Sequence, residues 1–246
     1  SDLLGKSNKG WISSITSLAT PHDGSTLADI VKKTFPFVQY FIGLAGVAGT
    51  NFYNFDLSQW NLIRGTDETW ASYVRRMRNH KAWKTKNISA WDLSVDGAAE
   101  LNGYLNASSD IYYFSFVFSA TSKDKSTGYY VPNKDAFLLI RSRAKLLGSK
   151  IVFKSDGSET DSTWWDNDGI VNVRSMKGPT SGMGGPDPIV NFVKSDPLIQ
   201  GQWYTFDTIN LDHYQSVGHM LPKEKRKILD SLYLNHAKLL LSLPKD

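Results

Sequence analysis

The stretch IYYFSFVFSA, residues 111–120, decides the fold class because nearly every position in it is apolar or aromatic. A strand with one face in water alternates apolar and polar side chains, whereas a strand buried on both faces is apolar throughout. Strands of parallel sheets are the ones that helices cover on both faces. The stretch therefore predicts a central strand of a parallel sheet.

Segments on either side of this stretch predict the remaining elements. Two further strand candidates are residues 11–19 (WISSITSLA) and 202–209 (QWYTFDTI). The helix candidates share apolar side chains at helical spacing; they begin near Ser25 and near Thr66 and cover residues 93–105 and 222–243. Strands alternating with helices predict a single α/β domain over residues 1–246. Its three expected strands form a small sheet for that length.

The composition is that of a globular protein without cysteine. Of the 246 residues, 41% are hydrophobic and none is Cys, which excludes a thiolate nucleophile and any Cys-ligated zinc or iron–sulfur site. The 28 Lys and Arg residues exceed the 24 Asp and Glu residues by a margin too small to indicate nucleic-acid binding. The longest apolar stretch, residues 35–55, contains Pro36 and three glycines, so we expect no clean membrane-spanning helix of about 20 residues.

Polar residues follow the predicted strands, where an open α/β sheet places its functional groups. The turn PHDG (21–24) and the pair Asp212-His213 each follow a strand, and Asp168 lies on a loop between them. Asp168 precedes His213 by 45 positions, which is the chain order of acid and base in α/β hydrolases. Taken alone, each residue has a simpler interpretation, as a turn former or a surface histidine.

Five runs of the chain add a more specific signal. They are SLATPHDGSTLAD (17–29), NFDLSQWNL (54–62), AWDLSVDGAAELN (90–102), NDGIVNVRSMKGP (167–179) and NLDHYQSVG (210–218). In content, order and approximate spacing they resemble the lipases of staphylococci and thermophilic bacilli. The resemblance extends from about Trp11 to the end. It implies the C-terminal part of an α/β-hydrolase, with a mostly parallel sheet flanked by helices.

The same resemblance assigns roles to residues. It implies that Asp168 is the acid and His213 the base of a Ser-Asp-His triad, and that residues 25–50 form an amphipathic lid helix that meets a lipid–water interface. The implied reaction is hydrolysis of lipid esters of the triacylglycerol type. The family's serine lies in a G-x-S-x-G pentapeptide, which does not occur here. We therefore expect the serine upstream of this chain, and we expect the 246 residues alone to be inactive.

The metal positions of the family carry different residues in this chain. Its calcium carboxylates lie two and seven positions after the triad histidine, which are Gln215 and Met220 here, and a zinc ligand position falls on Asn87. Hard cations prefer anionic oxygen ligands. We expect no metal and no other cofactor.

Several alternatives stand beside the hydrolase interpretation. The substitutions at Gln215 and Met220 favour a non-catalytic lipid-surface or lipid-binding protein that kept the fold. We expect His22 and Asp23 to shape a turn at a pocket and not to act in catalysis. The basic run 75–86 is interleaved with aromatic residues and could bind an anionic polymer, although a solvated basic face is the favoured interpretation. The resemblance favours secretion, and nothing in the sequence indicates an oligomeric state.

Overall fold

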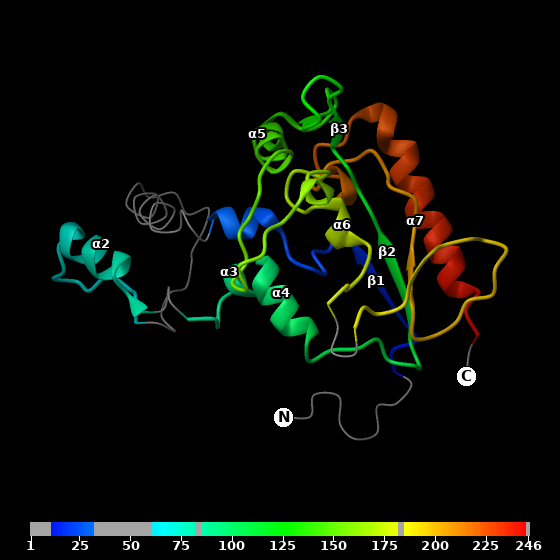
Figure 1. Cartoon of the computed structure of the whole chain (residues 1–246), viewed down its shortest axis with the longest axis horizontal. Helices are drawn as coiled ribbons and strands as arrows, with labels where there is room; N and C mark the ends of the chain where they lie inside the picture. Colours follow the sequence, from blue (N-terminus) through cyan, green and yellow to red (C-terminus); the bar gives the residue numbers. More distant parts are fainter. Residues whose placement is uncertain (1–10, 32–60, 82–84, 182–184, 245–246) are drawn as a thin grey trace.

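The structure is a computed structural model that describes residues 11–31, 61–81, 85–181 and 185–244 (Figure 1). Its centre is a four-stranded sheet in the order β1-β2-β6-β5, and every pair of neighbouring strands is parallel. The strands are β1 (Ser14–Leu18), β2 (Tyr112–Phe116), β5 (Ile189–Asn191) and β6 (Trp203–Thr205). The prediction of a mostly parallel sheet flanked by helices is confirmed.

The expected number of strands was wrong, because β5 is missing from the sequence prediction. β5 has only three residues and comes directly after a stretch of sequence, residues 177–188, that is rich in Gly and Pro. So short a segment has no readable periodicity, and its strand conformation depends on pairing with β6, in which Ile189 lies opposite Trp203. The sequence also did not predict the hairpin of β3 (Thr121–Lys123) and β4 (Tyr130–Pro132).

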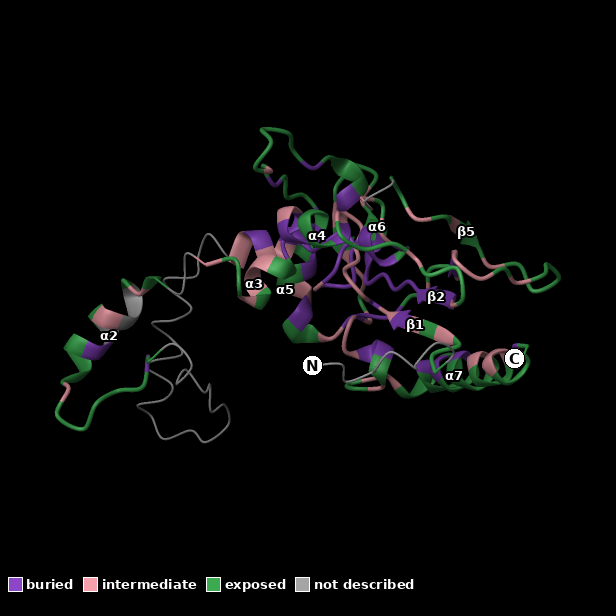
Figure 2. Ribbon diagram, turned by 90° about the horizontal axis from the view of Figure 1, so that it is seen from below, coloured by how far each residue is buried: buried purple, intermediate pink, exposed green. Residues whose placement is uncertain are grey.

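Helices cover both faces of the sheet. α7 (Arg226–Leu241) lies on one face, while α4 (Val95–Asn102) and α6 (Val173–Met176) lie on the other (Figure 2). Further helices in the described ranges are α2 (Trp70–Arg78), α3 (Ser89–Asp92), α5 (Leu138–Leu147) and the 3-10 turns η3 (Ser162–Trp164), η4 (Gln215–Val217) and η5 (Lys223–Lys225).

The helix predicted over residues 93–105 is present as α4, which is shorter than predicted and is preceded by a separate short helix, α3. α3 ends at Asp92, and Ser94 begins α4 as an extended N-cap whose hydroxyl accepts from the Gly97 N–H at 3.1 Å. A serine in this position satisfies a backbone donor at the helix start, which explains why α4 begins at Val95. The cap residue is fully buried.

The core lies around β2, whose five residues are all buried. The phenyl rings of Phe116 and Phe206 stack with centroids 4.2 Å apart. Leu229 and Leu232 of α7 join the same hydrophobic cluster from the helix side. This burial confirms the prediction that residues 111–120 contain a strand covered on both faces.

The predicted lid segment lies mostly outside the described residues. Residues 26–31 are helical, which agrees with a helix start near Ser25, and residues 32–60 are not described. No helix in the described ranges is long and apolar enough to cross a membrane.

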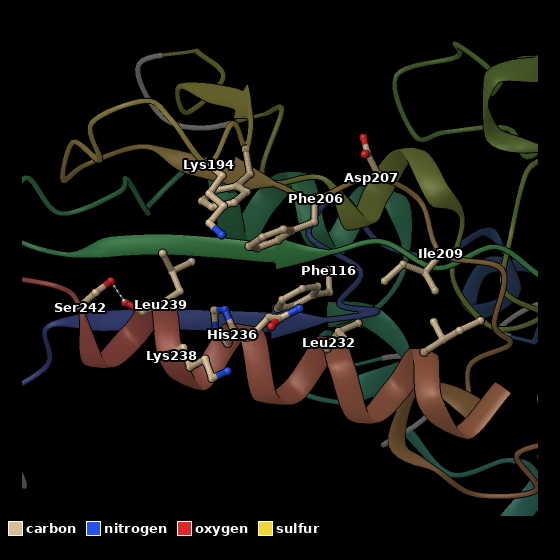
Figure 3. A pocket seen from close by; sticks show the side chains of 13 residues that line it. Phe116, Lys194, Phe206, Asp207, Ile209, Leu232, His236, Lys238, Leu239 and Ser242 are labelled. Atoms are coloured by element: carbon tan, nitrogen blue, oxygen red, sulfur yellow. Dashed lines mark hydrogen bonds between the residues drawn. The ribbon is translucent and has the colours of Figure 1, made fainter.

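An apolar groove of about 630 Å³ lies between α7 and the segments that follow β5 and β6 (Figure 3). Phe116, Phe206 and His236 line it, and Lys194 and Lys238 lie along it. Its lining includes neither Asp168 nor His213, so it is separate from the candidate site described next.

Candidate functional site

The turn that carries Asp168 is fixed by backbone hydrogen bonds. Ile170 and Val171 donate their N–H groups to Asp168 Oδ1 at 2.9 and 2.7 Å. Gly169 has a φ of +91°, and a Cβ there would lie 2.6 Å from Ile140 Cγ1. Glycine adopts this left-handed conformation without strain. The Asn-Asp-Gly sequence thus forms a turn in which one carboxylate oxygen is bound and the other is left for a further partner.

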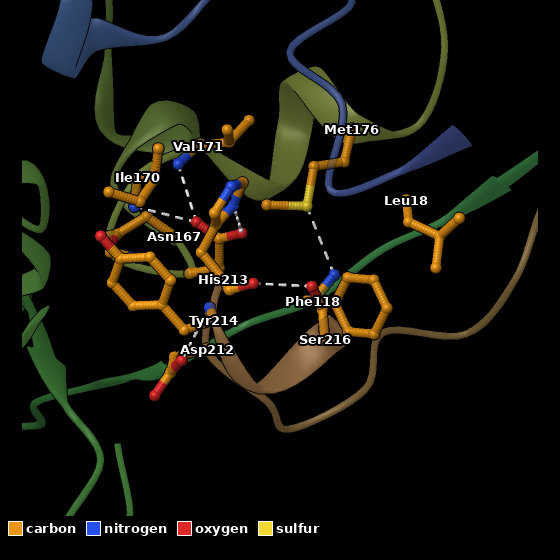
Figure 4. Close-up of polar contacts among 12 residues, drawn as sticks. Leu18, Phe118, Asn167, Ile170, Val171, Met176, Asp212, His213, Tyr214 and Ser216 are labelled. Carbon is orange, nitrogen blue, oxygen red and sulfur yellow. Dashed lines mark hydrogen bonds and ion pairs between the residues drawn. The ribbon is translucent and has the colours of Figure 1, made fainter. Parts of the chain in front are cut away.

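His213 binds that second oxygen. Its Nδ1 lies 2.8 Å from Asp168 Oδ2, and its backbone N–H donates to the Asp168 carbonyl at 3.1 Å (Figure 4). The carboxylate is fully buried, whereas the imidazole is 32% exposed. A buried carboxylate on Nδ1 fixes the ring orientation and leaves Nε2 for proton transfer, as a general base requires. The structure thus brings together the two site residues expected from the sequence.

The surroundings of His213 raise the affinity of its ring for a proton. Burial on its own lowers the pKa of His213, but the hydrogen bond and the charge of Asp168, with the nearby charge of Asp212, more than offset that effect. The pKa of His213 is therefore raised above its usual value. A carboxylate partner stabilises the imidazolium that forms when the ring accepts a proton.

The turn after His213 is held by local hydrogen bonds. Asp212 is buried, and its Oδ1 accepts the backbone N–H groups of Tyr214 and Gln215 at 3.0 Å each. Ser216 Oγ donates to the His213 carbonyl at 2.7 Å. These contacts make the segment 212–216 a tight turn leading into η4. They hold the backbone that carries the imidazole in one conformation.

Two buried asparagines support the Asp168 turn and were missed from the sequence. Asn167 accepts the Gly169 N–H at 2.8 Å and donates its amide to the Trp165 carbonyl at 2.8 Å. Asn172 accepts the backbone N–H of Thr26 at 2.9 Å, which connects the turn to the helical segment 26–31. Both side chains are fully buried. The sequence feature that could have indicated this support is the pair of asparagines on either side of residues 168–171 (DGIV).

His22 and Asp23 lie in a separate cluster. His22 Nε2 is 2.9 Å from Ser17 Oγ, and burial lowers the pKa of His22 to about 4, so the ring is neutral. Asp23 accepts the backbone N–H of Thr180 at 2.8 Å, which attaches the turn 21–24 to the segment that follows α6. Burial raises the pKa of Asp23, and the Thr180 hydrogen bonds oppose that rise.

The metal positions implied by the resemblance are dispersed. Gln215 is buried, with its Oε1 accepting from the Asp212 N–H and its Nε2 donating to the Asp135 carbonyl. Met220 is 55% exposed, and Asn87 lies on the exposed segment before α3. Within the described ranges, no three His, Asp or Glu side chains are grouped so that they could hold a metal ion.

The basic run 75–86 is partly neutralised by acidic neighbours. Arg76 forms an ion pair with Glu68 at 2.7 Å, and Lys86 forms one with Glu100 at 2.5 Å. Residues 82–84 of the run lie outside the described residues. Ion pairs of this kind suit a solvated protein surface.

Comparison with known proteins places the chain in a family. Residues 1–241 match the family model described as the lipase-like C-terminal domain. The chain belongs to this family. The match covers the sheet, Asp168 and His213, and it confirms the resemblance to lipases that the five sequence runs indicated.

Individual relatives agree with the family. The chain is 29% identical over 231 residues to lipase 2 of Staphylococcus aureus. The matched region covers 92% of this chain and 31% of that protein. The structure of EstA from Clostridium botulinum is 31% identical, with a TM-score of 0.74, and the match covers 96% of this chain and 55% of that one. Staphylococcus hyicus lipase has the same fold, with a TM-score of 0.74 at 22% identity over 97% of this chain and 60% of that one. The chain thus spans about a third of the curated relative's length.

Proposed function

We propose that the protein containing this chain is a serine ester hydrolase that acts on lipid esters. The observation that carries the proposal is the contact of 2.8 Å between Asp168 Oδ2 and His213 Nδ1, with the carboxylate buried and the ring partly exposed. The relatives named lipases support lipid esters as the substrate class. The parallel sheet supports an α/β-hydrolase fold, of which this chain forms the C-terminal part.

In the proposed mechanism His213 acts as the general base and Asp168 as its orienting acid. His213 Nε2 takes the proton of a serine hydroxyl while that oxygen attacks the ester carbonyl. The imidazolium then gives the proton to the leaving alcohol, and in the second half of the reaction His213 activates water in the same way. Asp168, held by two backbone N–H groups, orients the imidazole and stabilises the imidazolium when it forms.

The serine and the oxyanion-hole donors are proposed to lie upstream of residue 1 in the full-length protein. No G-x-S-x-G pentapeptide occurs in these 246 residues. Without a nucleophile and without donors for the tetrahedral intermediate, the chain alone is expected to be inactive. We also propose that residues 25–50 form the lid through which the protein meets a lipid–water interface.

Ester hydrolysis by the full-length protein tests the proposal. Purified wild type and the His213→Ala variant are compared on p-nitrophenyl esters of increasing chain length and on emulsified triacylglycerol. We expect turnover by wild type and its loss in the variant. Binding to liposomes by both proteins, with hydrolysis by neither, would instead support the non-catalytic lipid-binding function that the residues at Gln215 and Met220 favour.

A further inference from the structure

A buried lysine lies under the His213 turn. The side chain of Lys225 is 9% exposed, and its Nζ lies 2.6 Å from Asp135 Oδ2 and 2.7 Å from the Asn210 carbonyl. Lysine is rarely buried unless its charge is paired. The ammonium group therefore connects the start of α7, to which Lys225 belongs, with two other segments. These are the residues leading to His213 and the loop that carries Asp135.

Further hydrogen bonds join the same two loops. Gln215 Nε2 donates to the Asp135 carbonyl at 2.9 Å, and the Phe137 N–H donates to Asp212 Oδ2 at 2.7 Å. The turn that carries His213 is thus attached to residues 135–137 on both sides of the histidine. The ion pair with Lys225 is the one charge–charge contact in this set.

We propose that Lys225 is a positioning residue for His213, and that its ammonium group, paired with Asp135, supplies an internal cation in place of the calcium ion that the family resemblance implies. The proposal rests on the hydrolase function proposed above. The contacts of Lys225 are with Asp135 and Asn210 and not with Asp168 or His213. Its proposed role is therefore to orient the imidazole through the turn that carries it.

The residues at the family's calcium positions do not fit that ion. Calcium selects anionic oxygen ligands, whereas Gln215 is neutral and both ends of its amide are engaged by the protein. Met220 offers only a thioether and is 55% exposed. Asp135, whose backbone carbonyl accepts from Gln215, has its carboxylate paired with Lys225. The positive charge in this group of residues is therefore the ammonium group of Lys225.

The position of the ion pair explains why a distant lysine would affect chemistry. Proton transfer requires His213 Nε2 within hydrogen-bond reach of the serine, and a displacement of about 1 Å can reduce the rate about 100-fold. Removing the ammonium group leaves Asp135 without its cation and the Asn210 carbonyl without its donor. The His213 turn would then lose one of its attachments to residues 135–137.

Kinetics of the full-length protein test the proposal, with p-nitrophenyl butyrate as the probe. Lys225→Met is expected to lower kcat about 10- to 100-fold with KM within about twofold of wild type. Lys225→Arg, which keeps the charge, is expected to recover most of the lost kcat. The matched control is Lys227→Met, on the exposed side of the same helix start, which should leave kcat unchanged. Calcium chloride and EDTA should leave wild-type kcat unchanged.

A spectroscopic readout separates positioning from general stability. The downfield proton resonance of His213 Nδ1–H, bonded to Asp168, is expected to shift or broaden in Lys225→Met well below the thermal midpoint and to recover in Lys225→Arg. If Lys225→Met does not fold, Asp135→Asn provides the same comparison.

Unchanged kcat and an unchanged resonance in Lys225→Met, with only a lower midpoint, would overturn the proposal. Activation of the wild type by calcium would overturn it as well. If the wild type hydrolyses no ester, the hydrolase function fails, and the resonance alone decides the role of Lys225.

Discussion

Two histidines follow the strands of this sheet, and they differ in their partners. His22 contacts a serine hydroxyl, at 2.9 Å from Ser17 Oγ, whereas His213 contacts a carboxylate, at 2.8 Å from Asp168 Oδ2. Judged by distance, His22 resembles a base beside its nucleophile. Its pKa, however, is lowered by burial to about 4, while the pKa of His213 is raised by its carboxylate.

The difference shows that a histidine beside a hydroxyl is not by itself catalytic. A general base must accept a proton during the reaction, and a buried ring with a low pKa does so poorly. The Ser17 hydroxyl also lies 3.3 Å from the Phe114 carbonyl, to which it donates, so it is held as part of the sheet. His22 packs its ring against Trp203 with centroids 4.4 Å apart. We therefore propose a structural role for Ser17 and His22 and a catalytic role for Asp168 and His213.

The largest expected effect comes from removing His213. In the full-length protein, His213→Ala is expected to lower kcat by about four orders of magnitude or more, because the serine loses its base. Steady-state hydrolysis of p-nitrophenyl butyrate measures this loss. The matched variant is His22→Phe, which keeps an aromatic ring against Trp203 and should retain kcat within about tenfold. Equal losses in the two variants would contradict the assignment of roles.

The pH dependence of stability should distinguish the same two residues. Because the folded-state pKa of His22 is lowered, the unfolded chain binds the extra proton between pH about 6.5 and about 4, and stability falls as the pH falls through that window. The pKa of His213 is raised, so its contribution is fully present below pH about 6.5 and is lost as the pH rises through the folded-state value.

Urea unfolding at several pH values measures the His22 effect. We expect wild type to lose up to about 3 kcal/mol more than His22→Phe between pH 6.5 and 4. The variant serves as the reference because buried carboxyl groups with raised pKa values, such as Asp23, oppose the trend equally in both proteins. Parallel curves for the two proteins would show that His22 is not buried as described.

A smaller effect is expected on the pKa of His213 itself. Asp168→Asn removes the charge that raises this pKa but leaves the burial that lowers it. The pKa of His213 should therefore fall, and histidine NMR titration measures the change. Asp23→Asn, in the other cluster, is the control and should leave the titration of His213 unaltered. A His213 pKa that stays raised in Asp168→Asn would mean that a group other than Asp168 stabilises the protonated ring.

The smallest expected effect is that of Ser17→Ala. Loss of one buried hydroxyl should cost about 1 kcal/mol of the free energy of unfolding and leave kcat unchanged. Thermal unfolding and the ester assay together measure the two quantities. A large loss of kcat would make the hydroxyl beside His22 a reacting group and reverse the comparison.

The sequence predicted the long, regular parts of the fold. Residues 111–120 are apolar throughout, which is enough to predict a buried strand, and the parallel order followed from alternation with helices. β5 was missed because it has only three residues. α5 was missed because its apolar residues do not all lie on one face: Leu138 and Leu139 at its start are about 70% exposed. The buried residues of this helix are Ile140, Ala144 and Leu147. Short elements and exposed leucines depend on tertiary contacts that no local pattern contains.

The site was predicted by a different route. Asp168 and His213 are 45 positions apart, and no periodicity connects them; the resemblance to lipases named them, and the structure placed them in contact. Lys225 could not be predicted at all, because in the run KEKRK it has the appearance of a solvated charge. Its burial depends on Asp135 and Asn210, which are distant in the sequence.

Labelling with an alkyl fluorophosphonate tests the central claim most directly, because this reagent reacts with serines activated by a neighbouring base. The full-length protein is treated, digested and analysed by mass spectrometry, with the His213→Ala variant alongside. The account predicts one labelled serine, located before residue 1 of this chain, and no label in the variant. A labelled serine within these 246 residues, or labelling that persists in His213→Ala, would contradict it.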